Sequence, residues 1–232
     1  MSRRRLGALA ALVLATGFCV ALVLARMQRS GTPHHEYLMW NLFLAWLPFV
    51  LALGLYDADR RGRSRIVRCG LAFLWLLFLP NAPYLLTDLI HLNANPDPGI
   101  PRWYDAIMFG ACGWTGLALG IGSLLLVHAV ARRRTGAGVS WVLLVPTLAL
   151  VSFGIYLGRF VRLNSWDAIF RPAHVAQLVA APLRDPAAYP RFVGVTVLFT
   201  VFLMVAYLVV YTVTELRLEP EEQGATRSRR RV

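Results

Sequence analysis

The chain has 232 residues, 57% of them hydrophobic, and a mean hydropathy of +0.55. This composition is more apolar than that of soluble globular proteins and excludes that class. A net charge of +12 would suit a nucleic-acid-binding protein. The basic residues, however, are all arginines that lie mostly between or beside long apolar stretches, as they do at membrane borders, so we exclude nucleic acid as a partner.

Apolar stretches of about 20 residues recur along the sequence, and each is long enough to cross a hydrocarbon core of roughly 30 Å. None of them alternates between apolar and polar residues as a strand would, so we expect helices. The sequence therefore predicts an all-α fold, a polytopic transmembrane helical bundle embedded in the lipid bilayer. Its six predicted spans are Leu6–Ala25, Leu38–Tyr56, Ile66–Leu86, Tyr104–Val130, Val139–Gly158 and Phe192–Val213.

The first span follows Ser2-Arg3-Arg4, which resembles a twin-arginine signal, and it ends in a sequence that would suit a cleavage site. The apolar run is longer than the usual signal core of about 7–15 residues. We therefore interpret it as an uncleaved first helix. Cleavage would leave five spans with the same orientation.

The third span is interrupted near its end by LPNAP, residues 79–83. Pro80 and Pro83 each remove a backbone donor and clash with the preceding turn of a helix. We predict a kink here, in the outer third of the span. Because the kink frees backbone carbonyls that need a donor, Asn81 is the candidate to supply one.

A polar stripe follows if the helix resumes after the kink. Asn81, Tyr84, Asp88 and His91 are spaced three, four and three residues apart, which places them on one helical face. Such a stripe must face protein or water and not lipid.

The spacing of Asp88 and His91 is compatible with three roles. The two could ligate a metal, with Asp105 or Asp167 as a third ligand. They could also form an acid–base pair, or a structural pair held by hydrogen bonds. Since no HExxH motif or Cys/His cluster supports a metal, we predict no metal site and take Asp88 and His91 as candidate catalytic residues.

Two further spans carry packing and charge signals. In the fourth span, Gly116-x-x-x-Gly120 is typical of closely packed helices. The fifth span ends with Arg159 and Arg162, which share a face if the helix continues. Guanidinium groups suit phosphate or carboxylate ligands. They suit equally an ion pair with Asp88, Asp105 or Asp167.

The predicted topology brings polar side chains from four segments to one boundary of the membrane. Their clustering follows from topology alone, while their mutual contacts do not. As candidate ligand-binding residues we take Asn41, Asn81, Tyr84, Asp105, Arg159, Arg162, Asn164 and Asp167.

Four motifs carry a resemblance to a known family: WNLFLAWLP (40–48), LWLLFLPNAPYLLTDLIHL (74–92), WYDAIMFGACGWTGLALGIGSL (103–124) and YLGRFVRLNSWD (156–167). They resemble the uncharacterised bacterial family called domain of unknown function 1361, over about residues 38 to 213. The resemblance implies a multi-pass bacterial membrane protein without an assigned reaction, and it carries over no catalytic residue. With its bounds we divide the chain into an N-terminal transmembrane helix and outer loop (1–37), a membrane domain of five spans (38–213) and a cytoplasmic tail (214–232) whose polar composition predicts disorder.

Three functions are compatible with this pattern. The first is a protein with an outward-facing polar pocket that binds or processes an anionic lipid-linked or amphipathic substrate, as an enzyme or as a ligand binder. The second is a non-catalytic assembly or interaction protein with a structural polar cluster. The third is a transporter, which the nearly uncharged inner halves of the spans disfavour. The sequence identifies no cofactor and no protein partner.

The arginines also predict the orientation of the chain. Sixteen of them fall on the side of the membrane that holds both termini, and 8 fall on the other side. By the positive-inside rule, we expect both termini to be cytoplasmic. Together with the bacterial family that the motifs resemble, this implies a location in the bacterial cytoplasmic membrane.

Fusions to alkaline phosphatase, which is active only outside the cytoplasm, test this orientation. We expect activity from a fusion after Ala173 and none from a fusion after Gly224, because the two positions fall on opposite sides in the predicted topology. The reverse pattern would show that the whole assignment of sides is wrong.

Overall fold

The computed structural model describes residues 3–93, 99–163 and 170–216. Within these residues, six helical segments are long and apolar enough to cross a membrane, which confirms the predicted all-α bundle. The first span is longer than predicted, because its helix continues past Ala25. The six segments are Leu6–Ser30, Tyr37–Arg60, Arg65–Leu92, Arg102–Thr135, Ala137–Val161 and Pro190–Glu215.

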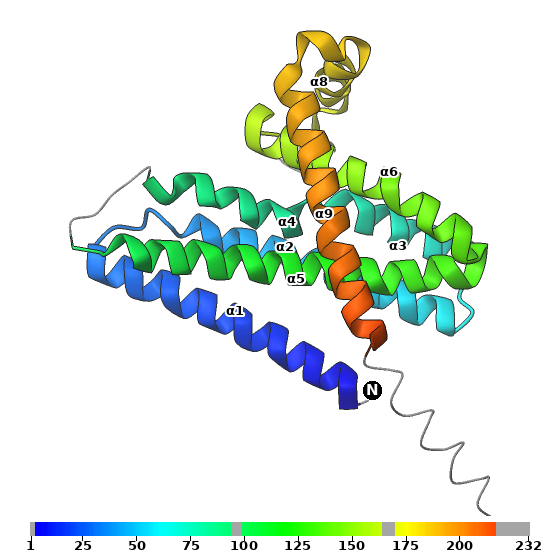
Figure 1. Cartoon of the computed structure of the whole chain (residues 1–232), viewed down its shortest axis with the longest axis horizontal. Helices are drawn as coiled ribbons and strands as arrows, with labels where there is room; N and C mark the ends of the chain where they lie inside the picture. Colours follow the sequence, from blue (N-terminus) through cyan, green and yellow to red (C-terminus); the bar gives the residue numbers. More distant parts are fainter. Residues whose placement is uncertain (1–2, 94–98, 164–169, 217–232) are drawn as a thin grey trace, which may run out of the picture.

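The centre of the bundle is α5 (Arg102–Thr135), against which α1 (Arg3–Ser30) and α2 (Tyr37–Arg60) pack. The third span begins as α3 (Arg65–Phe78), which packs on α2. In Figure 1 these helices run along the long axis.

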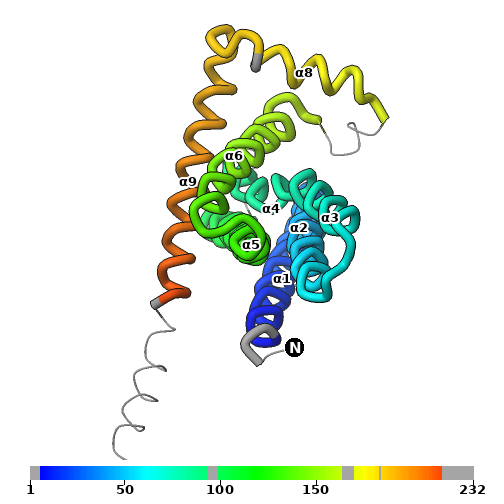
Figure 2. Tube along the Cα trace, turned by 90° about the vertical axis from the view of Figure 1, so that its right-hand side faces the viewer, coloured from blue at the N-terminus to red at the C-terminus, as the bar shows by residue number. Residues whose placement is uncertain are grey.

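The fifth span consists of α6 (Ala137–Tyr156) and the π-helical turn η2 (Leu157–Val161). The chain then forms α8 (Pro172–Arg184), the short η3 (Pro186–Ala188) and α9 (Pro190–Leu216). Figure 2 shows α9 on the outer side of α6. From the start of α9, α8 extends across the bundle.

Buried polar contacts hold α9 in place. His128 of α5 lies between Tyr207 of α9, with Nδ1 to hydroxyl at 2.5 Å, and Ser140 of α6, with Nε2 to hydroxyl at 3.1 Å. Since Ser140 donates its own proton to the Ala137 carbonyl, it accepts from Nε2, and Tyr207 donates to Nδ1. This neutral histidine therefore joins three helices without leaving a buried donor unpaired.

The third span kinks at the predicted position. After α3 ends at Phe78, the chain turns through Pro80 into the short α4 (Asn81–Tyr84). The Asn81 amide donates to the Phe78 carbonyl at 3.0 Å, which confirms it as the donor for a freed backbone carbonyl.

Beyond the kink, the structure differs from the α-helical stripe that the sequence indicated. The chain forms a 3₁₀ helix, η1 (Leu85–Asn93), in which Thr87 donates its hydroxyl to the Tyr84 carbonyl at 2.6 Å. With three residues per turn, Asp88 and His91 lie one above the other. One end of the bundle contains η1, the last turn of α1 and the starts of α2 and α5 (Figure 1). We call it the η1 end.

Close packing between α5 and the kink depends on Gly116, as the glycine pattern predicted. A β-carbon at Gly116 would lie 2.3 Å from the Ala82 carbonyl oxygen and 2.8 Å from Leu85 Cδ1. Gly120 lies against the same turn, and a β-carbon there would lie 3.3 Å from the Ala82 methyl group. The backbone at the kink therefore touches α5 directly.

Replacement of Gly116 by alanine should lower the melting temperature in detergent, with a loss of about 1–3 kcal/mol in stability, because the new methyl group must displace backbone atoms. Gly110→Ala is the matched control on the same helix, since a β-carbon there meets nothing within 4 Å. It should leave stability unchanged or raise it by less than about 1 kcal/mol. Equal effects of the two substitutions would contradict the close contact.

Candidate functional site

The guanidinium group of Arg159, on η2, is the centre of a polar cluster at the η1 end. Its Nε donates to the Thr87 hydroxyl at 2.8 Å, Nη1 donates to His91 Nε2 at 2.9 Å, and Nη2 donates to the Asp88 carboxylate. The guanidinium carbon also lies 4.4 Å from the centroid of the Tyr84 ring. The fifth span is thereby joined to the third by four side chains.

A side chain from the second span completes the cluster. Asn41 of α2 donates from Nδ2 to Asp88 Oδ2 at 3.1 Å. The Asp88 side chain is 1% exposed and that of Arg159 is 10% exposed, so the pair is removed from solvent. Loss of one partner would leave the other charge buried and unpaired. We call this set the Arg159 cluster: Asn41, Tyr84, Thr87, Asp88, His91 and Arg159.

The contacts determine the protonation of His91. An arginine can only donate, so His91 Nε2 must accept, and the ring proton lies on Nδ1. His91 is then neutral, and among the described residues Asp88 is the acidic group that balances the charge of Arg159.

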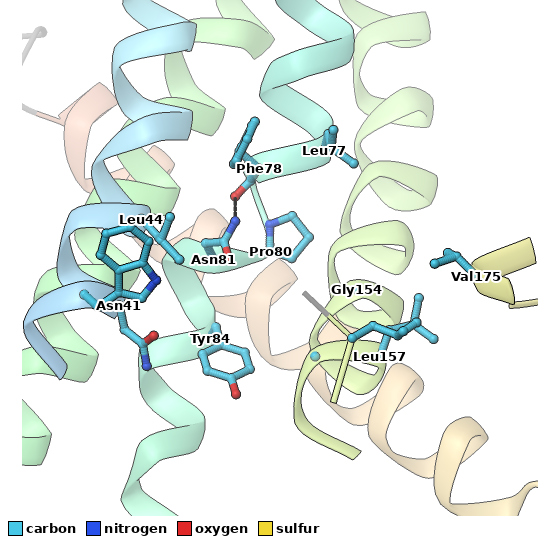
Figure 3. Close-up of a pocket in the computed structure, with 13 residues that line it drawn as sticks. Asn41, Leu44, Leu77, Phe78, Pro80, Asn81, Tyr84, Gly154, Leu157 and Val175 are labelled. Carbon is cyan, nitrogen blue, oxygen red and sulfur yellow. Dashed lines mark hydrogen bonds between the residues drawn. The ribbon is translucent and has the colours of Figure 1, made fainter. Parts of the chain in front are cut away.

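A cavity of about 270 Å³ adjoins the cluster, between α2, the kinked third span and the fifth span. Its wall is mostly apolar. Figure 3 shows Asn41, Asn81 and Tyr84 on one side of the cavity, and Leu157 with Val175 of α8 on the other. Asn41 and Tyr84 belong to both the cavity wall and the Arg159 cluster.

Two glycines of the fifth span allow it to approach the kink this closely. A β-carbon at Gly154 would lie 2.5 Å from Pro80 Cγ, and one at Gly158 would lie 3.2 Å from the ring of Tyr84. Larger side chains at these positions would separate Arg159 from its partners.

Asp105 does not join the Arg159 cluster, in contrast to its predicted place in a shared site. It forms a second buried ion pair with Arg26 of α1, whose Nε and Nη2 donate at 2.8 and 3.3 Å. The side chain of Asp105 is 9% exposed and that of Arg26 is 2% exposed. The reason is that α1 continues to Ser30, which places Arg26 inside the bundle. The length of the apolar run predicts that the span ends at Ala25.

His35 is a buried residue that sequence reasoning missed. It is 4% exposed, in the connection between α1 and α2, and its Nδ1 has no hydrogen-bond partner among the residues that the structure describes. Burial first, and then the nearby charge of Arg26, lower the pKa of His35. The ring lies 6.2 Å from that of Tyr37, which lies 6.0 Å from that of His91. His35 therefore lies near Arg26, and the ring of Tyr37 separates it from His91 of the Arg159 cluster. No motif in the sequence marks it.

The remaining predicted residues fall outside the cluster. Arg162 ends η2 in the left-handed conformation, with φ of 61°, so it does not share a helical face with Arg159. Its side chain makes no ion pair within the described part of the chain. Asn164 and Asp167 lie outside the described residues. In the residues that are described, no group of three or more His, Cys, Asp and Glu side chains could hold a metal ion.

The family model described as "Protein of unknown function (DUF1361)" matches residues 40–206, which is more than half of the chain. The matched region contains the whole Arg159 cluster but excludes Arg26. No curated protein and no solved structure matches the chain. With its six apolar helices, the chain is a multi-pass membrane protein, and it belongs to the DUF1361 family.

Proposed function

We propose that the protein binds an anionic amphipathic molecule, such as a lipid-linked substrate, at the η1 end. The apolar part of the ligand occupies the cavity, and its polar head lies at the Arg159 cluster. The observation that carries the proposal is that a mostly apolar cavity shares Asn41 and Tyr84 with a buried polar cluster. Ligand sites commonly combine apolar walls with a few converging polar groups.

The charge of the ligand head requires a cation other than Arg159, because Asp88 already balances that residue. Arg162 is the candidate. It precedes Leu163, which lines the cavity, and its left-handed backbone costs about 1–2 kcal/mol in a residue other than glycine. Such strain is common at binding sites, where the interactions of the side chain with a ligand outweigh the free-energy cost of the backbone conformation.

Binding is better supported than acid–base catalysis. Asp88 accepts from both Arg159 and Asn41, and His91 Nε2 accepts from Arg159. A general base needs a free acceptor within reach of the proton that it removes. Processing of a bound substrate would therefore require Arg159 to withdraw from one of these groups.

The proposal places the cavity on the outer side of the bacterial cytoplasmic membrane. The unequal distribution of arginines, 16 to 8, supports this orientation. An outward-facing cavity would receive its ligand from the outer leaflet.

A second candidate function is that of a non-catalytic assembly protein. The observation in its favour is that the Arg159 cluster satisfies its charges internally, with an ion pair that joins the third and fifth spans. In this case the cluster would serve helix packing alone, and the cavity would have no specific ligand.

Replacement of Arg162 by glycine separates ligand binding from stability. Glycine relieves the left-handed strain, so stability should rise by about 1 kcal/mol. Loss of the guanidinium should weaken binding of decyl phosphate by about tenfold, or roughly 1.4 kcal/mol. Isothermal titration calorimetry in a neutral detergent measures the affinity, and thermal unfolding measures the stability.

Arg184→Gln, on α8, is the control for a general loss of positive charge and should leave the affinity unchanged. Arg162→Lys should bind with intermediate affinity, because lysine keeps the charge but loses the forked geometry. If Arg162→Gly binds decyl phosphate as tightly as the wild type, Arg162 does not recognise the head group.

Substitutions at Asp88 and His91 distinguish the two candidate functions. Asp88→Asn leaves Arg159 buried without a counter-charge and should cost about 3–5 kcal/mol. His91→Ala removes one hydrogen bond and should cost about 1 kcal/mol. Melting temperatures in detergent and decyl phosphate affinity measure both effects.

The binding proposal expects His91→Ala to remain folded and to bind decyl phosphate more weakly, since loss of the hydrogen bond to Arg159 frees the guanidinium group that holds Tyr84 in the cavity wall. Unchanged affinity in a stable His91→Ala variant would favour the assembly function. An unchanged melting temperature for Asp88→Asn would contradict the structural role of the ion pair.

A further inference from the structure

Three arginines surround one buried carboxylate at the end of the bundle opposite the η1 end. Arg133 donates from Nε and Nη2 to Asp59 Oδ2, at 3.1 and 2.9 Å, and Arg134 donates from Nε to Oδ1 at 2.7 Å. Arg68 Nη1 lies 3.9 Å from Oδ1. We call these four residues the Asp59 cluster. It joins α2 and α3 to the end of α5.

The cluster contains more positive charge than helix packing requires. One arginine would balance Asp59, whose side chain is 4% exposed, yet three guanidinium groups lie within 4 Å of it. Within the described part of the chain, Asp59 therefore leaves two of these three positive charges unbalanced. Had the cluster served only to neutralise a buried carboxylate, the extra cations would repel one another at no benefit.

The surplus charges are accessible and held in position. The side chains of Arg133 and Arg134 are 41% and 49% exposed. Arg134 uses Nε for Asp59, and its two terminal nitrogens make no hydrogen bond to another described residue, so they are available to a ligand. Arg133 also packs over the ring of Tyr56, with 4.7 Å between the guanidinium carbon and the ring centroid. An anion would bind with little further loss of side-chain entropy.

The position of the cluster identifies the kind of anion. Ile66, near Arg68 on α3, is 84% exposed, and Val139, at the start of α6, is 51% exposed. Such side chains lie in hydrocarbon in a membrane-spanning protein, so the neighbouring guanidinium groups lie at the level of the lipid head groups.

We infer that the Asp59 cluster binds the phosphate group of an anionic phospholipid. The free nitrogens of Arg133 and Arg134 donate to the phosphate oxygens, and the acyl chains lie along the exposed apolar residues of α3 and α6. This site is separate from the proposed ligand cavity, because it lies at the other end of the bundle. Neither inference depends on the other.

Binding of phosphatidylglycerol to the full chain in a neutral detergent tests the inference. Native mass spectrometry counts bound lipid as its concentration is raised, and phosphatidylcholine is the comparison. We expect phosphatidylglycerol to bind more tightly than phosphatidylcholine, and Arg134→Gln to weaken it by about fivefold to tenfold. Arg68→Gln is the second variant in case Arg134→Gln does not fold, since its contact with Asp59 is the longest of the three.

Arg63→Gln is the matched control. Arg63 is exposed at the same end of the bundle and is not paired with Asp59, so its loss changes the net charge equally. Unchanged lipid affinity in Arg63→Gln, together with weaker binding in Arg134→Gln, would support the site. Equal losses in the two variants would overturn it in favour of general electrostatic attraction. Displacement of phosphatidylglycerol by millimolar inorganic phosphate would also overturn it, because the site would then bind free phosphate.

Discussion

The ion pair between Asp88 and Arg159 is the constraint on which the rest of the η1 end depends. Charges removed from water at membrane depth must meet a partner at hydrogen-bond distance, or each costs several kcal/mol. The pair joins the third span to the fifth, which are separated in the chain by the whole of α5. The local backbone at both spans is therefore arranged to bring two side chains together.

That arrangement involves a departure from regular helix on both sides. In the third span, Pro80 ends α3, and the following 3₁₀ helix aligns Asp88 with His91. In the fifth span, a π-helical turn carries Arg159. Gly154 and Gly158 remove the side chains that would separate the two spans. The cavity lies where these irregular segments meet α2, so the same packing that buries the charges also leaves a hollow beside them.

Features that depend on local chemistry could be predicted from the sequence. Hydropathy predicts six spans, and the prolines predict the kink together with Asn81 as its donor. Topology brings Asp88 and Arg159 to the same boundary but does not pair them, since Asp105 lies there too. Arg26 pairs with Asp105 because α1 continues for another turn past the predicted end of the span. His35 is buried beside the rings of Tyr37 on α2 and Phe109 on α5. Such contacts are determined by tertiary structure, which hydrophobic periodicity and the length of apolar runs do not predict.

The two ends of the bundle differ in how their buried carboxylates are paired with arginines. At the η1 end, Asp88 with Arg159 and Asp105 with Arg26 balance one to one, and both pairs are buried. At the other end, one buried carboxylate faces three arginines that remain partly exposed. Balanced pairs add little field outside the protein, whereas surplus cations attract anionic head groups. The arginine-rich end is thus suited to hold the protein at one membrane surface. The proposed ligand site lies at the η1 end, where Asp88, Arg159 and the cavity meet, so the two proposed binding sites are at opposite ends of the bundle.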